Sequence, residues 1–294
     1  MLRLVVCSVL AGVALLFFGS QARAVTILEI HDIGESGTTN DGTIFEAEPN
    51  PTSPSTGTGV FEPFVRIQGS GAELRNGNSQ NPSQGPQQGF NTDSKEPDIN
   101  FNTKGGKWTS SITLGDAGTV TRNGTRYLEF TLDANEPGRV GSVENLIDIT
   151  DIQLFAGPNL ADPESLGLGT SFLANGQLNL GPNADLIWRL DNAVNGPVTV
   201  ELAASICDAP GQCGSGHGDM RLLIPVSALD LSGGVNLSDN LVFYSSYDRA
   251  GGATGGFEEW RRGTGPPIPE PSAALVFSVG ALIVGGVTHR MRRS

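Results

Sequence analysis

The stretch TVTRNGTRYLEFTLD, Thr119–Asp133, decides the fold class of this 294-residue chain. Asn123 and Gly124 are residue types that tolerate the positive φ angles of a type I′ turn, and β-prone residues flank them on both sides. Apolar and polar residues alternate from Leu128 to Leu132, so one face of that strand is apolar. The stretch therefore predicts a β-hairpin that packs on a core.

Short apolar segments separated by Gly, Asn, Asp and Pro recur along the chain, and we find no helical periodicity of useful length between residues 25 and 262. The predicted strands are Val25–Ile33, Val60–Ile67, Trp108–Leu114, Leu146–Phe155, Leu186–Leu190, Val198–Ile206, Met220–Val226 and Leu241–Tyr247. Strands at this spacing indicate an all-β fold over residues 25–262, an antiparallel β-sandwich or jelly roll.

One interval interrupts this pattern. Asn76–Gly89 contains only Asn, Gly, Ser, Gln and Pro, a composition that buries no apolar area. We expect residues 76–97 to form a flexible loop or linker.

The N-terminus has the layout of a secretory signal peptide. Arg3 precedes the apolar run Leu4–Phe18, and Ala22 and Ala24 make a small-x-small cleavage site. We expect a signal helix in residues 1–24, recognised by the Sec translocon and signal peptidase, with an uncleaved anchor as the alternative. The mature chain would begin at Val25.

The mature region is strongly acidic. Removing the two arginines of residues 1–24 and the three of residues 272–294 leaves 13 basic and 31 acidic groups, a net charge of −18. Such a surface repels phosphate backbones, which argues against nucleic-acid binding, and it suits Ca²⁺ or other hard cations.

The cysteines agree with export. Cys7 falls in the signal peptide, which leaves Cys207 and Cys213 as a pair separated by five residues. In an oxidising compartment we expect a disulfide between them, with two free thiols or a metal site as the alternatives.

Signals for catalysis are weak. The chain has no G-x-S-x-G, P-loop, H-E-x-x-H or dinucleotide-binding pattern. His217 with Asp219 fits a Gly-rich turn better than a catalytic pair. Glu144, Asp148 and Asp151 gather around one predicted strand, but 31 acids supply such groups by chance. We predict no catalytic residues.

A cation site has slightly more support. Asp98, Asn100 and Asn102 place oxygen ligands at alternate positions, as in a calcium loop. The later positions depart from an EF-hand, because Thr103 and Thr109 stand where Gly and Glu belong. The polar face of a strand gives the same alternation, so the only cofactor that we consider is Ca²⁺.

The C-terminus combines three features. Pro269, Glu270, Pro271 and Ser272 precede the uncharged run 272–288, and Arg290, Arg292 and Arg293 follow it. Seventeen residues reach about 26 Å as a helix, close to a hydrocarbon core of about 30 Å. We expect a transmembrane helix over 272–288 with its arginines in the cytoplasm.

In this order, residues 263–294 resemble a PEP-CTERM sorting signal, although His289 and Met291 interrupt the basic run. The resemblance implies recognition by exosortase, a membrane protease-transferase of bacteria that make exopolysaccharide, and cleavage near the motif. The tail would then anchor the protein only temporarily, before release to the cell surface or the extracellular matrix.

Residues 98–260 are similar to an uncharacterised group of PEP-CTERM secreted proteins. The shared landmarks are Lys107–Thr109, Tyr127–Asp133, Ile149–Phe155, Gly214–Ile224, Leu241–Tyr247 and Gly256–Trp260. The resemblance supports one β domain and transfers no active site. Within GFEEW, Phe257 and Trp260 suggest an edge or closing contact of the sandwich. Glu258, Glu259 and Trp260 are the alternative ligand candidates, with Trp260 as a sugar-stacking platform.

We therefore expect a non-catalytic exported protein of the cell surface or matrix, associated with exopolysaccharide or a biofilm. A carbohydrate- or Ca²⁺-binding module is the alternative, and a secreted hydrolase is the third possibility.

Overall fold

The computed structural model describes residues 24–48, 62–68, 87–95, 101–135, 145–163, 171–204, 206, 218–248, 257–266 and 268. Across these ranges the regular structure is β-strand and short 3-10 turns, which confirms an all-β fold. No helix in the described part of the chain is long and apolar enough to cross a membrane. The expected signal helix and the expected transmembrane helix at 272–288 lie outside the described residues.

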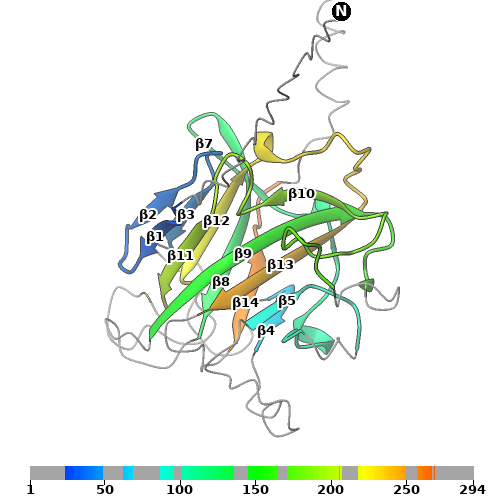
Figure 1. The fold of residues 1–294 in the computed structure, drawn as a ribbon, viewed down its shortest axis with the longest axis horizontal. Coiled ribbons are helices and arrows are strands. Elements are labelled where there is room, and N and C mark those ends of the chain that lie inside the picture. The colour runs from blue at the N-terminus through cyan, green and yellow to red at the C-terminus, as the bar shows by residue number, and fades with distance from the viewer. Residues whose placement is uncertain are drawn as a thin grey trace, which may run out of the picture.

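Two sheets make up the fold (Figure 1). Sheet A has the order β1-β11-β9-β13-β5, with β10 beside β9 and β6 beside β13. Its strands are β1 (Thr26–Ile30), β11 (Val198–Ala203), β9 (Leu146–Gly157), β13 (Asn240–Asp248), β5 (Gln87–Phe90), β10 (Asp185–Arg189) and β6 (Ile112–Thr113).

Sheet B has the order β2-β3-β12-β8-β14-β4, with β7 beside β8. Its strands are β2 (Ser36–Thr38), β3 (Ile44–Ala47), β12 (Met220–Pro225), β8 (Thr125–Ala134), β14 (Glu258–Arg262), β4 (Val65–Ile67) and β7 (Thr119–Arg122).

The sheets face each other across one apolar core, as in a β-sandwich. Phe243 of sheet A lies 4.9 Å from Phe130 and 4.8 Å from Trp260 of sheet B, measured between ring centroids. Trp260 has no exposed surface, and its Nε1 donates to the hydroxyls of Ser245 and Tyr247 on the opposite sheet. The expected closing contact at Trp260 is therefore confirmed.

A short segment links the sheets at the edges formed by β4 and β5. The amide of Asn102 donates to Gln88 O at 2.7 Å, and Asn102 O accepts from the amide of Gln68 at 2.9 Å. Residues 101–104 thus satisfy backbone groups on both edges, which leaves fewer unpaired groups there.

The hairpin that decides the fold class is present. Asn123 and Gly124 have φ angles of 50° and 81° between β7 and β8, as a type I′ turn requires. The strands expected at Val25–Ile33, Leu146–Phe155, Leu186–Leu190, Val198–Ile206, Met220–Val226 and Leu241–Tyr247 are also confirmed, with shifted ends.

The predicted linker over 76–97 is wrong for residues 87–90, which form β5 against β13. The composition predicted a linker here because the interval contains few large apolar side chains. The strand is held instead by close approach of its backbone to neighbouring residues. A Cβ on Gly89 would lie 2.6 Å from Thr103 Oγ1 and 2.8 Å from Ile67, so only glycine fits. The rest of the interval is described only for residues 91–95, which carry no strand.

Three further expectations need correction. The Trp108–Leu114 strand shrinks to β6, because 3-10 turns occupy Gly106–Trp108 (η2) and Leu114–Asp116 (η3) and a Thr113–Asp116 capping box starts the second. The strand expected at Val60–Ile67 begins only at Val65. The sandwich is not wholly antiparallel, since β1 pairs with β11 in parallel.

Candidate functional site

The most polar part of sheet A's outer face centres on Asp151 in the middle of β9. The pairing of β9 with β13 shifts register there: Ser246 lies opposite Asp151, and Tyr247 lies opposite Ile149. Thr150 is therefore an extra residue, and this bulge turns both Thr150 and Asp151 toward the outer face. Bulges commonly re-aim a side chain beside a functional site.

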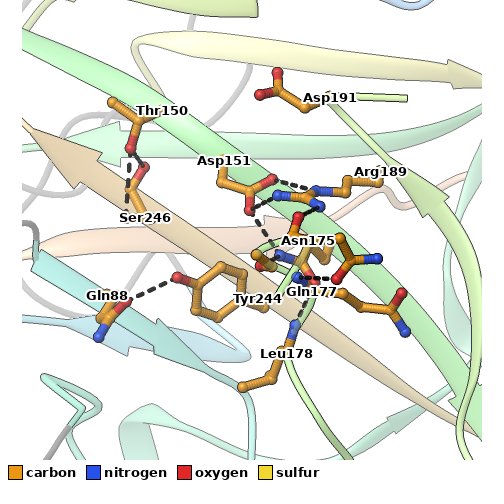
Figure 2. Close-up of polar contacts among 12 residues, drawn as sticks. Gln88, Thr150, Asp151, Asn175, Gln177, Leu178, Arg189, Asp191, Tyr244 and Ser246 are labelled. Carbon is orange, nitrogen blue, oxygen red and sulfur yellow. Dashed lines mark hydrogen bonds and ion pairs between the residues drawn. The ribbon is translucent and has the colours of Figure 1, made fainter. Parts of the chain in front are cut away.

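Arg189, at the end of β10, holds the Asp151 carboxylate with two donors (Figure 2). Nη2 lies 2.9 Å from Oδ2 and Nε lies 3.2 Å from Oδ1. The side-chain Nε2 of Gln153 donates to the same Oδ2 at 2.6 Å. Both members of the ion pair are mostly buried, so this is a strong, directional contact.

The same groups fasten residues 171–180 onto the sheet. Arg189 Nη1 donates to Asn175 O at 2.8 Å, and Gln153 donates to Gly176 O at 3.0 Å and accepts from the amide of Leu178 at 2.8 Å (Figure 2). Gln153 is fully buried, and these bonds satisfy its amide. These hydrogen bonds hold residues 171–180 against the outer face of sheet A.

An aromatic cluster completes the site beside the polar groups. Tyr244 lies between Phe101 and Phe172, with ring centroids 6.5 Å and 5.8 Å away, and its hydroxyl donates to Gln88 Oε1 at 2.8 Å. Tyr244 is buried, whereas Phe172 exposes 40% of its surface. Phe172 therefore presents a partly open ring at the rim of a polar surface.

Burial and charge shift two acids near this centre. Burial, reinforced by the Asp151 carboxylate, raises the pKa of the Tyr244 hydroxyl well above its usual value. Burial also raises the pKa of Asp191, and the Asp151 charge adds to that effect, although the amide of Val198 donates to Asp191 at 2.8 Å. Tyr244 therefore stays a neutral hydrogen-bonding group.

A row of carboxylates crosses the same face next to this site. Glu29 lies opposite Glu201, and Glu201 lies opposite Asp148. His31 Nε2 lies 2.8 Å from Glu201 Oε1. Like charges directly opposite each other on a sheet are destabilising.

The GFEEW candidates lie elsewhere, and they are buried. Glu258, Glu259 and Trp260 expose 3% of their surface or less, so Trp260 offers no face for a sugar to stack on. Glu259 forms an ion pair with Arg66, whose guanidinium lies between the rings of Trp108 and Phe257 at 3.8 and 4.0 Å. Arg66 thus connects two sequence landmarks, KWT and GFEEW, inside the protein.

Most other predicted site residues lie outside the described ranges. These are Ala22, Asp98, Asn100, Glu144, Cys207, Cys213, His217, Pro269, Glu270, Pro271, Ser272, Arg290, Arg292 and Arg293. Asn102 is described, and its side-chain oxygen accepts from the amide of Gln88 at 3.0 Å. Asp219 accepts from the amides of Ala134 and Ile206 at 2.8 and 3.1 Å, as a structural residue does. No group of three or more potential metal ligands occurs among the described residues.

A shallow, open pocket of about 540 Å³ lies at one end of β10, between Asp41, Trp188 and Val194. Asp41 accepts four hydrogen bonds there, from Thr39, the amide of Thr43, Trp188 Nε1 and Asn192, at 2.6–3.0 Å. Its carboxylate is saturated, so Asp41 joins the β2–β3 turn to the loop after β10.

No family model matches the chain, and no curated protein or solved structure is significantly similar to it.

Sequence reasoning identifies Asp151 only as one of several carboxylates expected by chance, and it misses the contacts that join Asp151 to Arg189 and Gln153 and Arg189 to Asn175. These residues come from three separate segments, and the bulge that unites them has no local sequence signal. The alternation break at Thr150-Asp151, two polar residues inside an apolar strand, was the one available hint.

Proposed function

We propose that this is a non-catalytic exported protein of the cell surface or extracellular matrix, delivered by its signal peptide and its PEP-CTERM tail. The observation that carries the proposal is the order of three elements in residues 269–293: the PEPS motif, the uncharged run and the arginines. The acidic composition and the all-β domain agree with a soluble surface module. Exosortase would be the processing partner, and the tail would be a membrane anchor until it is cut.

Intact masses of the protein from membrane and medium fractions test this proposal. We expect the membrane form to retain residues 272–294 and the released form to lack them. Replacing Arg290, Arg292 and Arg293 together by Gln should disturb membrane orientation and reduce release, whereas Lys95→Gln, at an exposed position of the domain, should not. Retention of the tail in every released copy would contradict processing.

We propose as a second function that the outer face of sheet A binds the matrix polysaccharide. The supporting observation is the partly exposed ring of Phe172, which packs against Tyr244, whose hydroxyl donates to the half-buried Gln88. Sugars present apolar faces and paired hydroxyls, which aromatic rings and planar polar groups complement. A polymer would contact several strands of such a face at once.

Binding of exopolysaccharide isolated from the producing cells tests this second proposal. Phe172→Ala should weaken binding about tenfold, the equivalent of roughly 1.4 kcal/mol. Leu173→Ala is the matched control, because Leu173 is exposed next to it but has no ring. Equal binding by both variants and the unchanged protein would contradict a site on this face.

A further inference from the structure

The chain after β14 remains part of the domain almost to the sorting motif. Residues 263–266 together with Ile268, here called the strap, follow β14 and pass the start of β7. The amide of Gly263 donates to Glu129 O at 2.8 Å, and Pro266 O accepts from the amide of Thr119 at 3.0 Å and from its hydroxyl at 2.5 Å. A Cβ on Gly265 would collide with Thr119 O, so the strap lies tight against β7.

The strap ends in the core. Ile268 exposes 3% of its surface and belongs to the cluster between the two sheets. Pro269, the first residue of the sorting motif, follows at once. The domain therefore reaches the motif without an intervening linker.

Tail length then limits how far the domain can stand from a bilayer. Three residues lie between Ile268 and Ser272, where the uncharged run begins, and the four residue steps span at most about 14 Å when fully extended. The headgroup layer on one side takes up about 5–8 Å of that. The exit point thus lies within roughly one Debye length, about 8 Å, of the lipid surface.

The strap also fixes which end of the domain is near. It leaves beside Thr119, at the end that carries the β7–β8 hairpin (Figure 1). η3 lies at this end too, because the amide of Leu114 donates to Asp239 O at 2.9 Å, next to the Asn240–Gly157 pair that ends β9. We call this the hairpin end.

The charge of the hairpin end suits a lipid surface better than the rest of this acidic chain does. From Ala117 to Leu128 there is no acid, and Arg122 and the exposed Arg126 flank the turn. Glu46 forms an ion pair with Arg122, and Asp116, Asp230 and Asp239 accept hydrogen bonds within their own turns, so the exposed Arg126 is the basic group presented at the turn. Basic groups near an anionic leaflet each contribute about 1 kcal/mol of attraction.

We propose that, while the tail is attached, the hairpin end of the domain faces the lipid headgroups and the carboxylate row of sheet A is held away from them. This rests on the proposed anchoring by residues 272–288. The β7–β8 hairpin is then the lipid-facing surface, and its occupant is an anionic phospholipid headgroup layer.

Site-specific quenching on the full mature chain, residues 25–294, tests the orientation. A fluorescent amino acid replaces either Thr125, at the hairpin tip, or Asp32, beyond the end of β1. Ile30 pairs with Leu202 and Leu202 with Ile147, so Asp32 lies where β9 begins, and the twelve residues of β9 span about 36 Å. Both replaced positions are exposed.

The protein is reconstituted into phosphatidylcholine–phosphatidylglycerol vesicles that carry a headgroup quencher. We expect quenching at residue 125 to exceed that at residue 32, because residue 125 lies at the hairpin tip and residue 32 lies toward the start of β9. A 20-residue Gly-Ser insert between Ile268 and Pro269 should abolish the difference, because such a chain spans about 25 Å.

The possible failures are distinguishable. If the protein does not float with the vesicles, anchoring fails and the orientation fails with it. If it floats but both sites are quenched equally, or residue 32 more, anchoring stands and the proposed orientation is overturned. A difference that persists with the insert would also overturn it, because the short tether would not be its cause.

Discussion

Charged side chains are arranged in opposite ways on the outer faces of the two sheets. On sheet B, Glu46 lies between Arg122 and Arg221, with contacts of 2.5–2.6 Å, and Arg221 reaches Glu48 and Glu129 at 3.4 Å. On sheet A, the carboxylates of Glu29, Glu201 and Asp148 are in register with one another. The opposite charges on sheet B stabilise the fold, whereas the like charges in register on sheet A destabilise it. Sheet A's face is therefore the one whose charges call for an explanation outside the fold.

The largest expected effect is on sheet B, at the buried Arg66–Glu259 pair. Glu259→Ala should lower the free energy of unfolding by about 3–5 kcal/mol, because it leaves the Arg66 guanidinium buried without its counter-charge. Urea denaturation measures the loss. The double variant Arg66→Met with Glu259→Leu removes both charges and should recover much of it. A loss below about 1 kcal/mol in Glu259→Ala would show that the pair is dispensable.

The next largest effect is expected at Asp41, which joins the β2–β3 turn to the loop after β10. Burial alone would raise the pKa of Asp41, but hydrogen bonds from Thr39, Thr43 and Trp188 outweigh it and lower the pKa below 3.8. Asp41→Asn should lower the free energy of unfolding by about 2 kcal/mol at pH 7. The side-chain NH2 group of asparagine would face groups that themselves donate hydrogen bonds.

The Asp41 effect should depend on pH. Since the pKa of Asp41 is lower in the folded state, its contribution to stability is present above about pH 3.8 and disappears as the pH falls through the folded-state value. Urea denaturation at pH 7, 5 and 3 should show the gap between Asp41→Asn and the unchanged protein closing. Asp32→Asn, at an exposed position, is the control and should show no gap at any of these pH values.

On sheet A, Asp151→Asn should cost about 1 kcal/mol and loosen residues 171–180, because Arg189 and Gln153 lose their shared acceptor. Hydrogen exchange at the amide of Leu178 should accelerate, while exchange in β12 stays unchanged. Unaltered exchange at Leu178 would mean that the segment is held by its apolar contacts alone.

The smallest effect should run in the stabilising direction. Glu29→Gln relieves like-charge repulsion in the carboxylate row and should raise the melting temperature by about 1 °C at low salt. The gain should vanish at about 0.5 M salt, because exposed charges are then screened. Glu35→Gln, outside the row, removes the same charge without this gain. A salt-independent rise would point to a cause other than repulsion in the row.

Local sequence signals predicted the strands well, since each rests on alternation and turn chemistry within a few residues. The Asn123-Gly124 hairpin and the buried side of β11 are examples. β5 escaped prediction because Gln87–Phe90 becomes a strand only through the edges of β13 and the 101–104 segment, which lie far away in the sequence.

The candidate site was predictable only in fragments. A carboxylate on a predicted strand could be seen at Asp151, but its capture by Arg189 depends on a bulge and on the pairing of β9 with β10. Likewise, the sequence leaves Glu258, Glu259 and Trp260 of GFEEW as alternative ligand candidates. They are buried because β14 lies inside sheet B, between β8 and β4, and not at its edge.

The parallel β1–β11 pair bears on how the chain folds. Thr26 pairs with Val198, 172 positions later in the sequence, and β3 likewise pairs with β12, whose residues follow after position 219. Contacts between such distant segments form late, because closing a long loop is entropically costly before any contact rewards it. In a chain that emerges N-terminus first, the first strand must wait for most of the domain. During that interval Ile30, which is buried in the folded protein, lacks its partner Leu202, so the first strand of the domain is among the last to pair.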